Sequence, residues 1–426
     1  MMKNEQAEAI LREVFEQAIN RASPALVVPA ALPEKPQGRC VVIGAGKASA
    51  AMAAAVDAAW QDVDVSGVVV TRYDHAVPAG RIQILEAAHP VADTMSQTAA
   101  EQIIAALQGL TENDLVLALM SGGGSALMAL PIEGLTLADK QAITRALLHS
   151  GANIHEMNLV RRHLSAVKGG KLAAMAQPAR LVSLMISDVP GDNPADIASG
   201  PTVADDSTPA EALSILDRYG ITVADSVRKV LQAEAECQSS LPTAKSAGEV
   251  RMIATPALSL QAAAEVARQH GITPMILGDA IEGESREVAT VMAGIAKSVK
   301  RFGHPLPKPA LLLSGGETTV TVQSKAGRGG RNTEFLLSLA CALQGETGIW
   351  ALAGDSDGID GTEDAAGALV FPESLARGEA AGMNPLDYLD KHDSYRYFQT
   401  LDDLVTTGPT LTNVNDIRAL LIVPPV

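Results

Sequence analysis

The chain has 426 residues, of which 47% are hydrophobic and 19% charged, a balance typical of a folded globular protein rather than a disordered one. A chain of this length is expected to form two domains. The net charge of −16, without any run of Lys or Arg, excludes the basic surface that a nucleic-acid-binding protein needs. An acidic enzyme for anionic substrates must gather its few cations in the site, so a cation beside a Gly-rich loop is informative.

The cysteine pattern and the N-terminus favour a cytoplasmic protein. Cys40, Cys237 and Cys341 are far apart and in no metal-ligand spacing, so we expect neither a disulfide scaffold nor a zinc site. Apolar residues near the N-terminus recur at the spacing of an amphipathic helix: Ala7, Ile10, Leu11, Val14, Phe15 and Ala18. This segment lacks the apolar core of a signal peptide, and no apolar stretch is long enough to span a bilayer.

Farther along, a short apolar run, a Gly-rich turn and a helical pattern follow one another repeatedly. The runs that we expect to be strands are 40–43, 65–70, 115–119, 180–186, 310–313 and 349–353. Strands alternating with helices predict α/β layers with largely parallel sheets, whose ligands bind beyond the carboxyl ends of the strands. A polar segment at 235–248 predicts a boundary between domains at 1–240 and 248–426, although the last segment could pack back on the first domain.

The first Gly-rich turn, Gly44–Ser49, follows a strand and opens a helix. Unpaired N–H groups at a helix N-terminus suit a phosphate or carboxylate, and Gly44 and Gly46 let the backbone approach one. The turn matches neither a P-loop nor a Rossmann fingerprint, which needs Gly or Ala where Ser49 stands. A tight turn with a solvated lysine is the alternative, but Lys47 in an anion-binding turn favours a functional site.

Three further segments of the first half carry candidate residues. The loop Ser121–Ser125, with Gly122, Gly123 and Gly124 between two hydroxyls, is a plausible phosphate nest. The run Asn158–Lys171 concentrates five potential cations: Arg161, Arg162, His163, Lys168 and Lys171. A capped, solvated helix end is the alternative for this run. The loop Ile186–Asp205 holds carboxylates that can bind Mg²⁺ or accept a hydroxyl proton: Asp188, Asp192 and Asp196.

The second half adds two glycine-rich regions. Ser314–Glu317 is followed by Gly327–Asn332, where Arg328 and Arg331 stand among glycines before a helix at 332–342. Arginine offers bidentate donors to phosphate or carboxylate, while a mobile, solvated loop is the alternative. The region Gly354–Thr362 clusters carboxylates but lacks the terminal Glu of an EF-hand loop, which favours Mg²⁺ over Ca²⁺.

Taken in order, these loops resemble the class II glycerate 2-kinases, whose C-terminal part is the MOFRL domain. The pieces that carry the resemblance are VIGAGKASAAM, LMSGGGSALM, RRHLSAVKGGKLA, ISDVPGDNPADIASGPT, SGGETTVTV, GRGGRN and GDSDGIDG. They run from about Val42 to Asn415 and so cover most of the chain. The combination is specific, although each loop alone is weak.

The resemblance implies two α/β domains, a Rossmann-like N-terminal domain and a smaller MOFRL domain, with the site in the cleft between them. It implies phosphorylation of the 2-hydroxyl of D-glycerate by ATP and Mg²⁺. The family's proposed lysine falls on Lys47, and its proposed arginine on Arg331 in preference to Arg328. Bacterial members also carry the label hydroxypyruvate reductase. No nucleic acid or membrane is expected as a partner, and a homo-oligomer is compatible with the sequence.

We assign roles within this resemblance as hypotheses. Lys47 and Arg331 neutralise the transferring phosphoryl group, and Asp188 orients or deprotonates the 2-hydroxyl. The residues expected to contact the nucleotide are Gly44, Gly46, Ser121, Gly122, Gly123, Gly124, Ser125, Gly315 and Gly316. Those expected to contact the acceptor acid are Arg161, Lys168, Asp192 and Asn193. Those expected to hold Mg²⁺ are Asp355, Asp357 and Glu317.

Two other classes of function compete with the kinase. A hydroxypyruvate reductase would use Gly44–Ser49 for a dinucleotide, but the run Val65–Val70 ends in Thr71-Arg72, which suits NADP rather than NAD. A regulator that binds a sugar acid would use the same cleft, but the sequence offers no helix-turn-helix module with a basic face.

Overall fold

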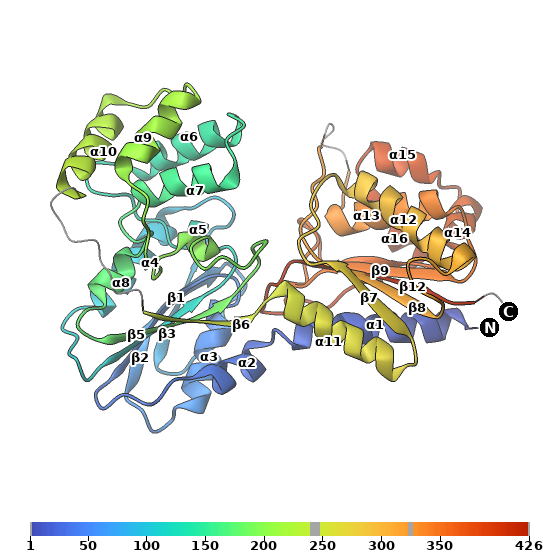
Figure 1. Ribbon diagram of the computed structural model, residues 1–426, viewed down its shortest axis with the longest axis horizontal. Helices are drawn as coiled ribbons and strands as arrows, with labels where there is room; N and C mark the ends of the chain where they lie inside the picture. Colours follow the sequence, from blue (N-terminus) through green and yellow to red (C-terminus); the bar gives the residue numbers. More distant parts are fainter. Residues whose placement is uncertain (1, 239–247, 323–326, 425–426) are drawn as a thin grey trace. The chain divides into compact units, whose positions relative to one another are not determined.

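The computed structural model describes residues 2–238, 248–322 and 327–424, and the chain forms two compact units (Figure 1). We call residues 24–253 the continuous unit. Residues 1–23 together with 254–426 form the discontinuous unit. Both units are layered α/β structures, as the sequence predicts.

The continuous unit is built on a six-stranded sheet of order β3-β2-β1-β4-β5-β6. Its strands are β1 (Cys40–Ala45), β2 (Val65–Arg72), β3 (Ile82–Ala87), β4 (Leu115–Met120), β5 (Arg180–Ile186) and β6 (Glu249–Ala254). The pairs from β3 through β5 are parallel, and β1 and β4 are buried along their whole length, as their continuous apolar sequences predict. The carboxyl ends of β1, β4 and β5 therefore meet at one edge of the sheet.

Two groups of helices accompany this sheet. Those next to the strands are α2 (Pro24–Ala31), α3 (Ser49–Ala59), α4 (Thr94–Ala106), α5 (Gly124–Leu127), α8 (Lys171–Met175) and the short 3₁₀ turn η1 (Ile197–Ser199). A separate helical layer has its own apolar core and consists of α6 (Leu137–Leu148), α7 (Ile154–His163), α9 (Pro209–Arg218) and α10 (Asp225–Gln238). The continuous unit thus contains a helical layer in addition to the sheet and the helices next to it.

The cationic run Asn158–Lys171 begins on helix α7, which ends at His163. The next residues leave the helix because Ser165 forms an isolated β-bridge with Pro131, and Ala166 N–H donates to the carbonyl of Leu130 at 2.9 Å. Lys168 therefore lies in an irregular segment rather than on α7.

The discontinuous unit has a second six-stranded sheet, of order β11-β10-β9-β12-β8-β7. Its strands are β7 (Thr273–Gly278), β8 (Ala310–Ser314), β9 (Ile349–Asp355), β10 (Gly367–Val370), β11 (Leu404–Val405) and β12 (Asp416–Ile422). Its helices are α1 (Asn4–Asn20), α11 (Pro256–Gln269), α12 (Ser285–Phe302), α13 (Arg331–Leu343), α14 (Ser374–Ala380), α15 (Pro385–Asp390) and α16 (Ser394–Leu401).

The second sheet is mixed, which corrects the expectation of largely parallel sheets. Only β7 and β8 pair in parallel, whereas β12 runs antiparallel to both β8 and β9, and β10 runs antiparallel to β9 and β11. Because β8 and β9 are both antiparallel to β12, their carboxyl ends lie at the same edge as the start of β12. The register makes this explicit, since Asp416 of β12 pairs with Asp355 of β9.

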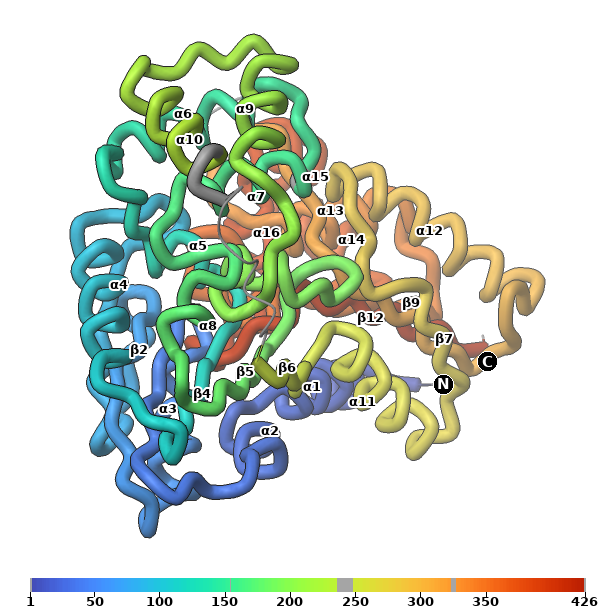
Figure 2. Tube along the Cα trace, turned by 60° about the vertical axis from the view of Figure 1, so that its left-hand side comes forward, coloured from blue at the N-terminus to red at the C-terminus, as the bar shows by residue number. Residues whose placement is uncertain are grey.

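The division of the chain differs from the expected domains 1–240 and 248–426. The amphipathic helix α1 buries all of its predicted apolar face against α11 and the second sheet, and α1 and α11 lie side by side in both views (Figures 1 and 2). The strand β6 completes the first sheet rather than opening the second block. Residues 239–247 of the expected boundary lie outside the described part of the chain. The final strand β12 stays in the second sheet and does not return to the first.

The membrane-spanning potential of the helices and the state of the cysteines bear on the cellular setting expected from the sequence. Within the described residues, no helix combines the length and apolar character needed to cross a membrane. Cys40 and Cys341 are free thiols, and burial raises the pKa of Cys40 to about 12. The side chain of Cys237 lies outside the described part of the chain. The expected cleft between domains stays a prediction.

Candidate active site

The turn after β1 is held against the loop after β4 by hydrogen bonds from its backbone N–H groups. Lys47 N–H donates to the carbonyl of Gly122 at 2.9 Å, and Ala48 N–H donates to Ser121 Oγ at 3.0 Å. Gly46 has φ of +145°, and a Cβ there would lie 2.1 Å from Ser121 Oγ, so only glycine fits. Gly46 is thus required for close packing of the two loops, which places the Lys47 turn beside the glycine loop.

The loop Ser121–Ser125 lies between the Lys47 turn and a strained segment. A Cβ on Gly123 would lie 3.4 Å from Lys47 Cγ and 3.0 Å from the ring of His89. On the far side, Ser125 Oγ lies 2.9 Å from Ser199 Oγ. Ala198 and Ser199 both have positive φ, at 52° and 64°, although neither is glycine. Strain of this kind is found at ligand sites that the surrounding structure over-determines.

A pocket with a volume of about 460 Å³ opens beside this loop. It is lined by Gly123 and Ser125, by residues 89–92, and by side chains of α6 and α7. Four cations line it, namely Lys140, Arg145, Arg161 and Lys168. The described residues that line this pocket include no Asp or Glu. The pocket therefore suits an anionic ligand.

Lys168 and Arg161, two predicted substrate residues, thus lie together in this pocket. Lys168 is buried, and its ammonium donates to Ser125 Oγ at 2.8 Å and to the Ser125 carbonyl. Burial lowers the pKa of Lys168 well below its usual value, and the charges of Lys140 and Arg161 lower it further. Burial also lowers the pKa of Arg161. The two residues share a wall, and their charges repel in the absence of an anion.

The loop after β5 carries the other predicted acids. Asp188 is half-buried and has an interaction partner. Asn193 serves its own turn, because its Oδ1 accepts from Ala195 N–H at 3.2 Å and its amide donates to Asp196 at 2.9 Å. Asp192 has positive φ, and its buried Oδ1 has no hydrogen-bond partner within the described part of the chain. Binding of substrate by Asp192 and Asn193, and the role of Asp188, stay predictions.

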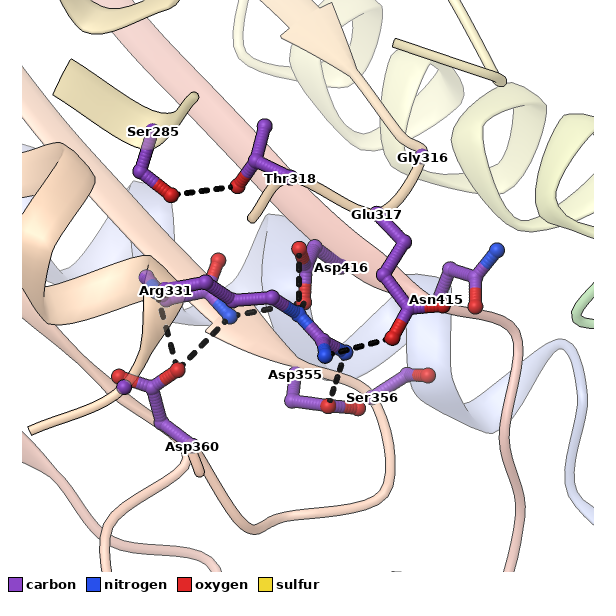
Figure 3. Close-up of polar contacts among 12 residues, drawn as sticks. Ser285, Gly316, Glu317, Thr318, Arg331, Asp355, Ser356, Asp360, Asn415 and Asp416 are labelled. Atoms are coloured by element: carbon purple, nitrogen blue, oxygen red, sulfur yellow. Dashed lines mark hydrogen bonds and ion pairs between the residues drawn. The ribbon is translucent and has the colours of Figure 1, made fainter. Parts of the chain in front are cut away.

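In the discontinuous unit, Arg331 lies at the centre of a carboxylate cluster (Figure 3). Its Nε lies 2.8 Å from Asp416 Oδ1, one terminal nitrogen lies 2.6 Å from Glu317, and the other lies 2.7 Å from Asp355. Burial alone would lower the pKa of Arg331, but the attraction of Asp416, Asp355 and Glu317 raises it above its usual value. The strand ends described above create this cluster, since β8, β9 and β12 supply the loop or strand of each acid.

Arg331 also lines a second pocket, of 450 Å³, together with Thr318, Glu334, His392 and the glycines Gly327, Gly329 and Gly330. Arg328 does not line it. The guanidinium of Arg328 pairs instead with Glu363, its Nε 3.0 Å from Oε2, and stacks over the ring of Tyr395 at 4.4 Å. The geometry therefore favours Arg331 over Arg328 for contact with a ligand.

The predicted metal ligands are engaged with the protein. Asp355 and Glu317 bind Arg331, and Asp357 accepts from the N–H of Ile359 at 2.9 Å. Among residues 2–238, 248–322 and 327–424, no group of three or more metal-ligating side chains is arranged to hold an ion. A magnesium ion needs only one or two protein carboxylates when substrate phosphates supply the rest. The oxygen donors of Asp355 and Glu317 fit that chemistry, and their role stays a prediction.

Gly315 and Gly316 have a clear packing role. Gly316 has φ of +101°, and a Cβ there would lie 2.2 Å from the backbone nitrogen of Ile281. The carbonyl of Gly315 accepts from buried Arg418 at 3.3 Å. Contact of these glycines with a nucleotide stays a prediction.

Sequence reasoning missed three residues of these clusters. Asp416 and Arg418 are fully buried and paired at 2.7 Å, and Asp416 bridges Arg418 to Arg331. Their only sequence signal is two charges in an otherwise apolar run near the C-terminus. Lys140 lies in the first turn of α6, and its spacing of three and seven residues from the buried Ile143 and Leu147 is the sequence signal that places it on the buried face.

Comparison with known proteins gives consistent matches for both units. Residues 10–232 match a family model described as a domain of unknown function (DUF4147), and residues 310–416 match the MOFRL family. A D-glycerate 2-kinase of Thermotoga maritima is 39% identical over 99% of this chain and 100% of its own. The solved structure of a glycerate kinase from that organism superposes with a TM-score of 0.90, at 39% identity over 98% of this chain and 100% of that one.

A more similar relative has a different name. A protein of Agrobacterium vitis, 61% identical over 98% of this chain and 94% of its own, bears the provisional name hydroxypyruvate reductase. Both labels that the sequence resemblance raises are therefore found among the relatives.

Proposed function

The chain belongs to the class II glycerate 2-kinase family, and on this premise we propose that it phosphorylates the 2-hydroxyl of D-glycerate, with ATP as donor and 2-phosphoglycerate as product. The observation that carries the proposal is the pocket of four cations beside the Lys47 turn, whose described lining has no acid. A small hydroxy acid is anionic at neutral pH, and such a pocket can bind it. We place the reaction in the cytoplasm, which the free thiols Cys40 and Cys341 support.

The chemistry needs charge neutralisation and positioning more than covalent catalysis. The 2-hydroxyl oxygen attacks the terminal phosphorus of ATP, the bond to ADP breaks, and the hydroxyl proton passes to Asp188. Lys47 and Arg331 reduce the negative charge of the transferring group. Arg161 and Lys168 hold the acceptor acid. Asp355 or Glu317 would hold Mg²⁺, which would supply positive charge to the phosphates.

The ion pairs of Arg331 support a role for it and its carboxylate partners in positioning a ligand. An arginine already paired with three carboxylates is held in a fixed geometry, which favours positioning of a ligand in the 450 Å³ pocket that it lines. The same carboxylates supply oxygen donors beside that pocket. We propose that this pocket takes part of the nucleotide.

Identification of the phosphorylated product tests the proposal. The protein is incubated with ATP, MgCl₂ and D-glycerate, and the product is identified by ³¹P NMR against authentic standards. We expect 2-phosphoglycerate and equimolar ADP. Formation of 3-phosphoglycerate would overturn the position of transfer, and no phosphorylated acid would overturn the kinase.

Hydroxypyruvate reduction is the second candidate, and the name of the Agrobacterium vitis relative favours it. Strand β2 ends in Thr71 and Arg72 with no acid to bind the ribose of NAD, so NADPH would be the reductant. Oxidation of NADPH in the presence of hydroxypyruvate, followed at 340 nm, tests this reading. We expect no oxidation above that of a protein-free control.

A further inference from the structure

Lys140 is a buried cation that the proposed mechanism does not use. It lies in α6, its side chain is among those that line the 460 Å³ pocket, and the residue is only 7% exposed. Its ammonium is buried and has no hydrogen-bond partner among the residues that the structure describes. An unpaired buried ammonium destabilises a fold, so its presence needs an explanation that the protein alone does not supply.

The groups around Lys140 increase the free-energy cost of keeping its buried ammonium charged. Burial lowers the pKa of Lys140 to about 7, and the charges of Lys171 and Arg161 add to that effect. Lys168, on the same pocket wall, is also affected by Lys140. Both of these neighbouring groups, Lys171 and Arg161, are cations. A bound anion would reverse this imbalance.

The hydrogen-bonding capacity of the pocket points the same way. Lys168 uses two of its three N–H donors on Ser125, whereas Lys140 uses none. Among the described residues, Arg161 donates only one long side-chain hydrogen bond, of 3.5 Å, to Asn158. Several charged donors on one wall therefore remain for a ligand with two or more oxygen acceptors.

We propose that Lys140 binds the carboxylate of the acceptor acid together with Arg161 and Lys168, and that Lys140 makes a negatively charged end a condition for binding. The inference rests on the proposed function for the identity of the acid. It adds to that function a specificity-determining residue that neither the motifs nor the names of the relatives indicate.

The position of the pocket favours the acceptor carboxylate over a phosphate of the nucleotide. Gly123 lines the pocket and also packs close to Lys47, which we assign to the transferring phosphoryl group. In a 2-hydroxy acid the carboxylate and the reacting hydroxyl are on adjacent carbons. A carboxylate in the pocket would therefore keep the 2-hydroxyl near Lys47. A phosphate offers the same kind of charge, and the experiment distinguishes the two.

The test compares Lys140→Met, which removes the charge at similar length, with Lys140→Arg, which keeps it. Lys229→Met is the matched control, because Lys229 is an exposed lysine of α10 in the same unit. For each variant, calorimetry gives the Kd of D-glycerate without nucleotide, and initial rates give KM for D-glycerate and for ATP. Glycerol, which lacks the carboxylate, is the neutral probe.

We expect Lys140→Met to weaken D-glycerate binding and raise its KM by about tenfold or more, as for loss of a hydrogen bond to a charged group. KM for ATP and the weak binding of glycerol should not change, and Lys140→Arg should recover most of the affinity. The melting temperature of Lys140→Met should equal or exceed that of the wild type, because an unpaired buried charge is removed. Lys229→Met should behave as the wild type.

Three results would overturn the inference. Unchanged Kd and KM for D-glycerate in Lys140→Met would show that Lys140 does not bind the acid. A rise in KM for ATP alone would assign the pocket to a nucleotide phosphate. A lower melting temperature with unchanged affinity would make Lys140 structural. Because Kd is measured without turnover, failure of the kinase assay leaves this test intact, and hydroxypyruvate then replaces D-glycerate as the carboxylate probe.

Discussion

Arg331 and Asp416 form a two-pronged ion pair, in which Arg331 Nε lies 2.8 Å from Oδ1 and 3.0 Å from Oδ2 of Asp416. Asp416 is fully buried and also binds Arg418 at 2.7 Å. One carboxylate therefore balances a structural arginine and the arginine that we assign to phosphoryl transfer.

Replacement of this shared carboxylate should affect stability and activity together. Asp416→Asn leaves two arginines without their buried partner, and we expect the free energy of unfolding to fall by about 3–5 kcal/mol. Urea denaturation measures this change, with Asp390→Asn as control, since the side chain of Asp390 is 80% exposed. A loss no greater than that of the control would contradict the role of the pair.

Removal of the Lys47 ammonium should lower turnover without unfolding the protein. Lys47→Ala is expected to reduce kcat by about 10²- to 10³-fold, the range for loss of a preorganised charge that stabilises a transition state. Lys35→Ala is the control, because Lys35 forms only an exposed pair with Asp62. Near-normal kcat in Lys47→Ala, with unchanged circular dichroism, would remove Lys47 from the mechanism.

The close approach of two loops predicts a steric effect at Gly46. Gly46→Ala would place Cβ 2.1 Å from Ser121 Oγ and 2.6 Å from the Ser121 carbonyl oxygen. Gly220→Ala shares the positive φ but has nothing within 4 Å, and should cost only about 1–2 kcal/mol. Thermal denaturation should show a larger loss for Gly46→Ala, together with loss of activity. Equal losses would mean that the loops can separate freely.

A magnesium titration tests the assignment of Asp355. If Asp355 binds the ion, Asp355→Asn should raise the Mg²⁺ concentration for half-maximal activity by about tenfold or more. Asp387→Asn, at an exposed position of α15, is the control. An identical titration curve for both variants would leave Asp355 only as a partner of Arg331.

The affinity for D-glycerate should depend on pH through Lys140. Burial holds the pKa of Lys140 at about 7 in the free protein, so the ammonium that binds the carboxylate is lost as pH rises through 7. Binding should therefore weaken from pH 6 to pH 8. The charged groups around it are Lys171, Arg161, Lys168, Arg145 and His89. Calorimetry across this range should show the dependence in the wild type and lose it in Lys140→Arg, and a dependence kept in that variant would exclude Lys140 as its source.

The sequence predicts the elements around the catalytic loops well, because buried parallel strands have continuous apolar runs and end in glycine turns. The strands β1, β4, β5, β8 and β9 all contain the predicted runs. The direction of β12 could not be predicted, since an apolar run does not reveal how a strand pairs. Asp416, at the start of that antiparallel strand, was missed for this reason.

Lys140 was missed for a different reason. Lys140 shares a face of α6 with the buried Ile143 and Leu147, but a lysine near the start of an amphipathic helix is ordinarily solvated, and the sequence does not show that this part of the helix is covered. Lys168 and Arg161 were found because they are part of a dense cationic run. The loops of the site could therefore be predicted from the sequence, whereas the contribution of Lys140 from α6 to the pocket could not.

The pairing of α1 with a unit whose other residues start at 254 has a consequence for synthesis on the ribosome. The apolar face of α1 emerges more than 200 residues before the strands and helix that cover it. The continuous unit can fold in that interval, whereas the later unit has to recruit a helix made long before. Chains that stall or are truncated after residue 253 would carry α1 with its apolar face exposed, and such chains are natural targets for chaperones and proteases.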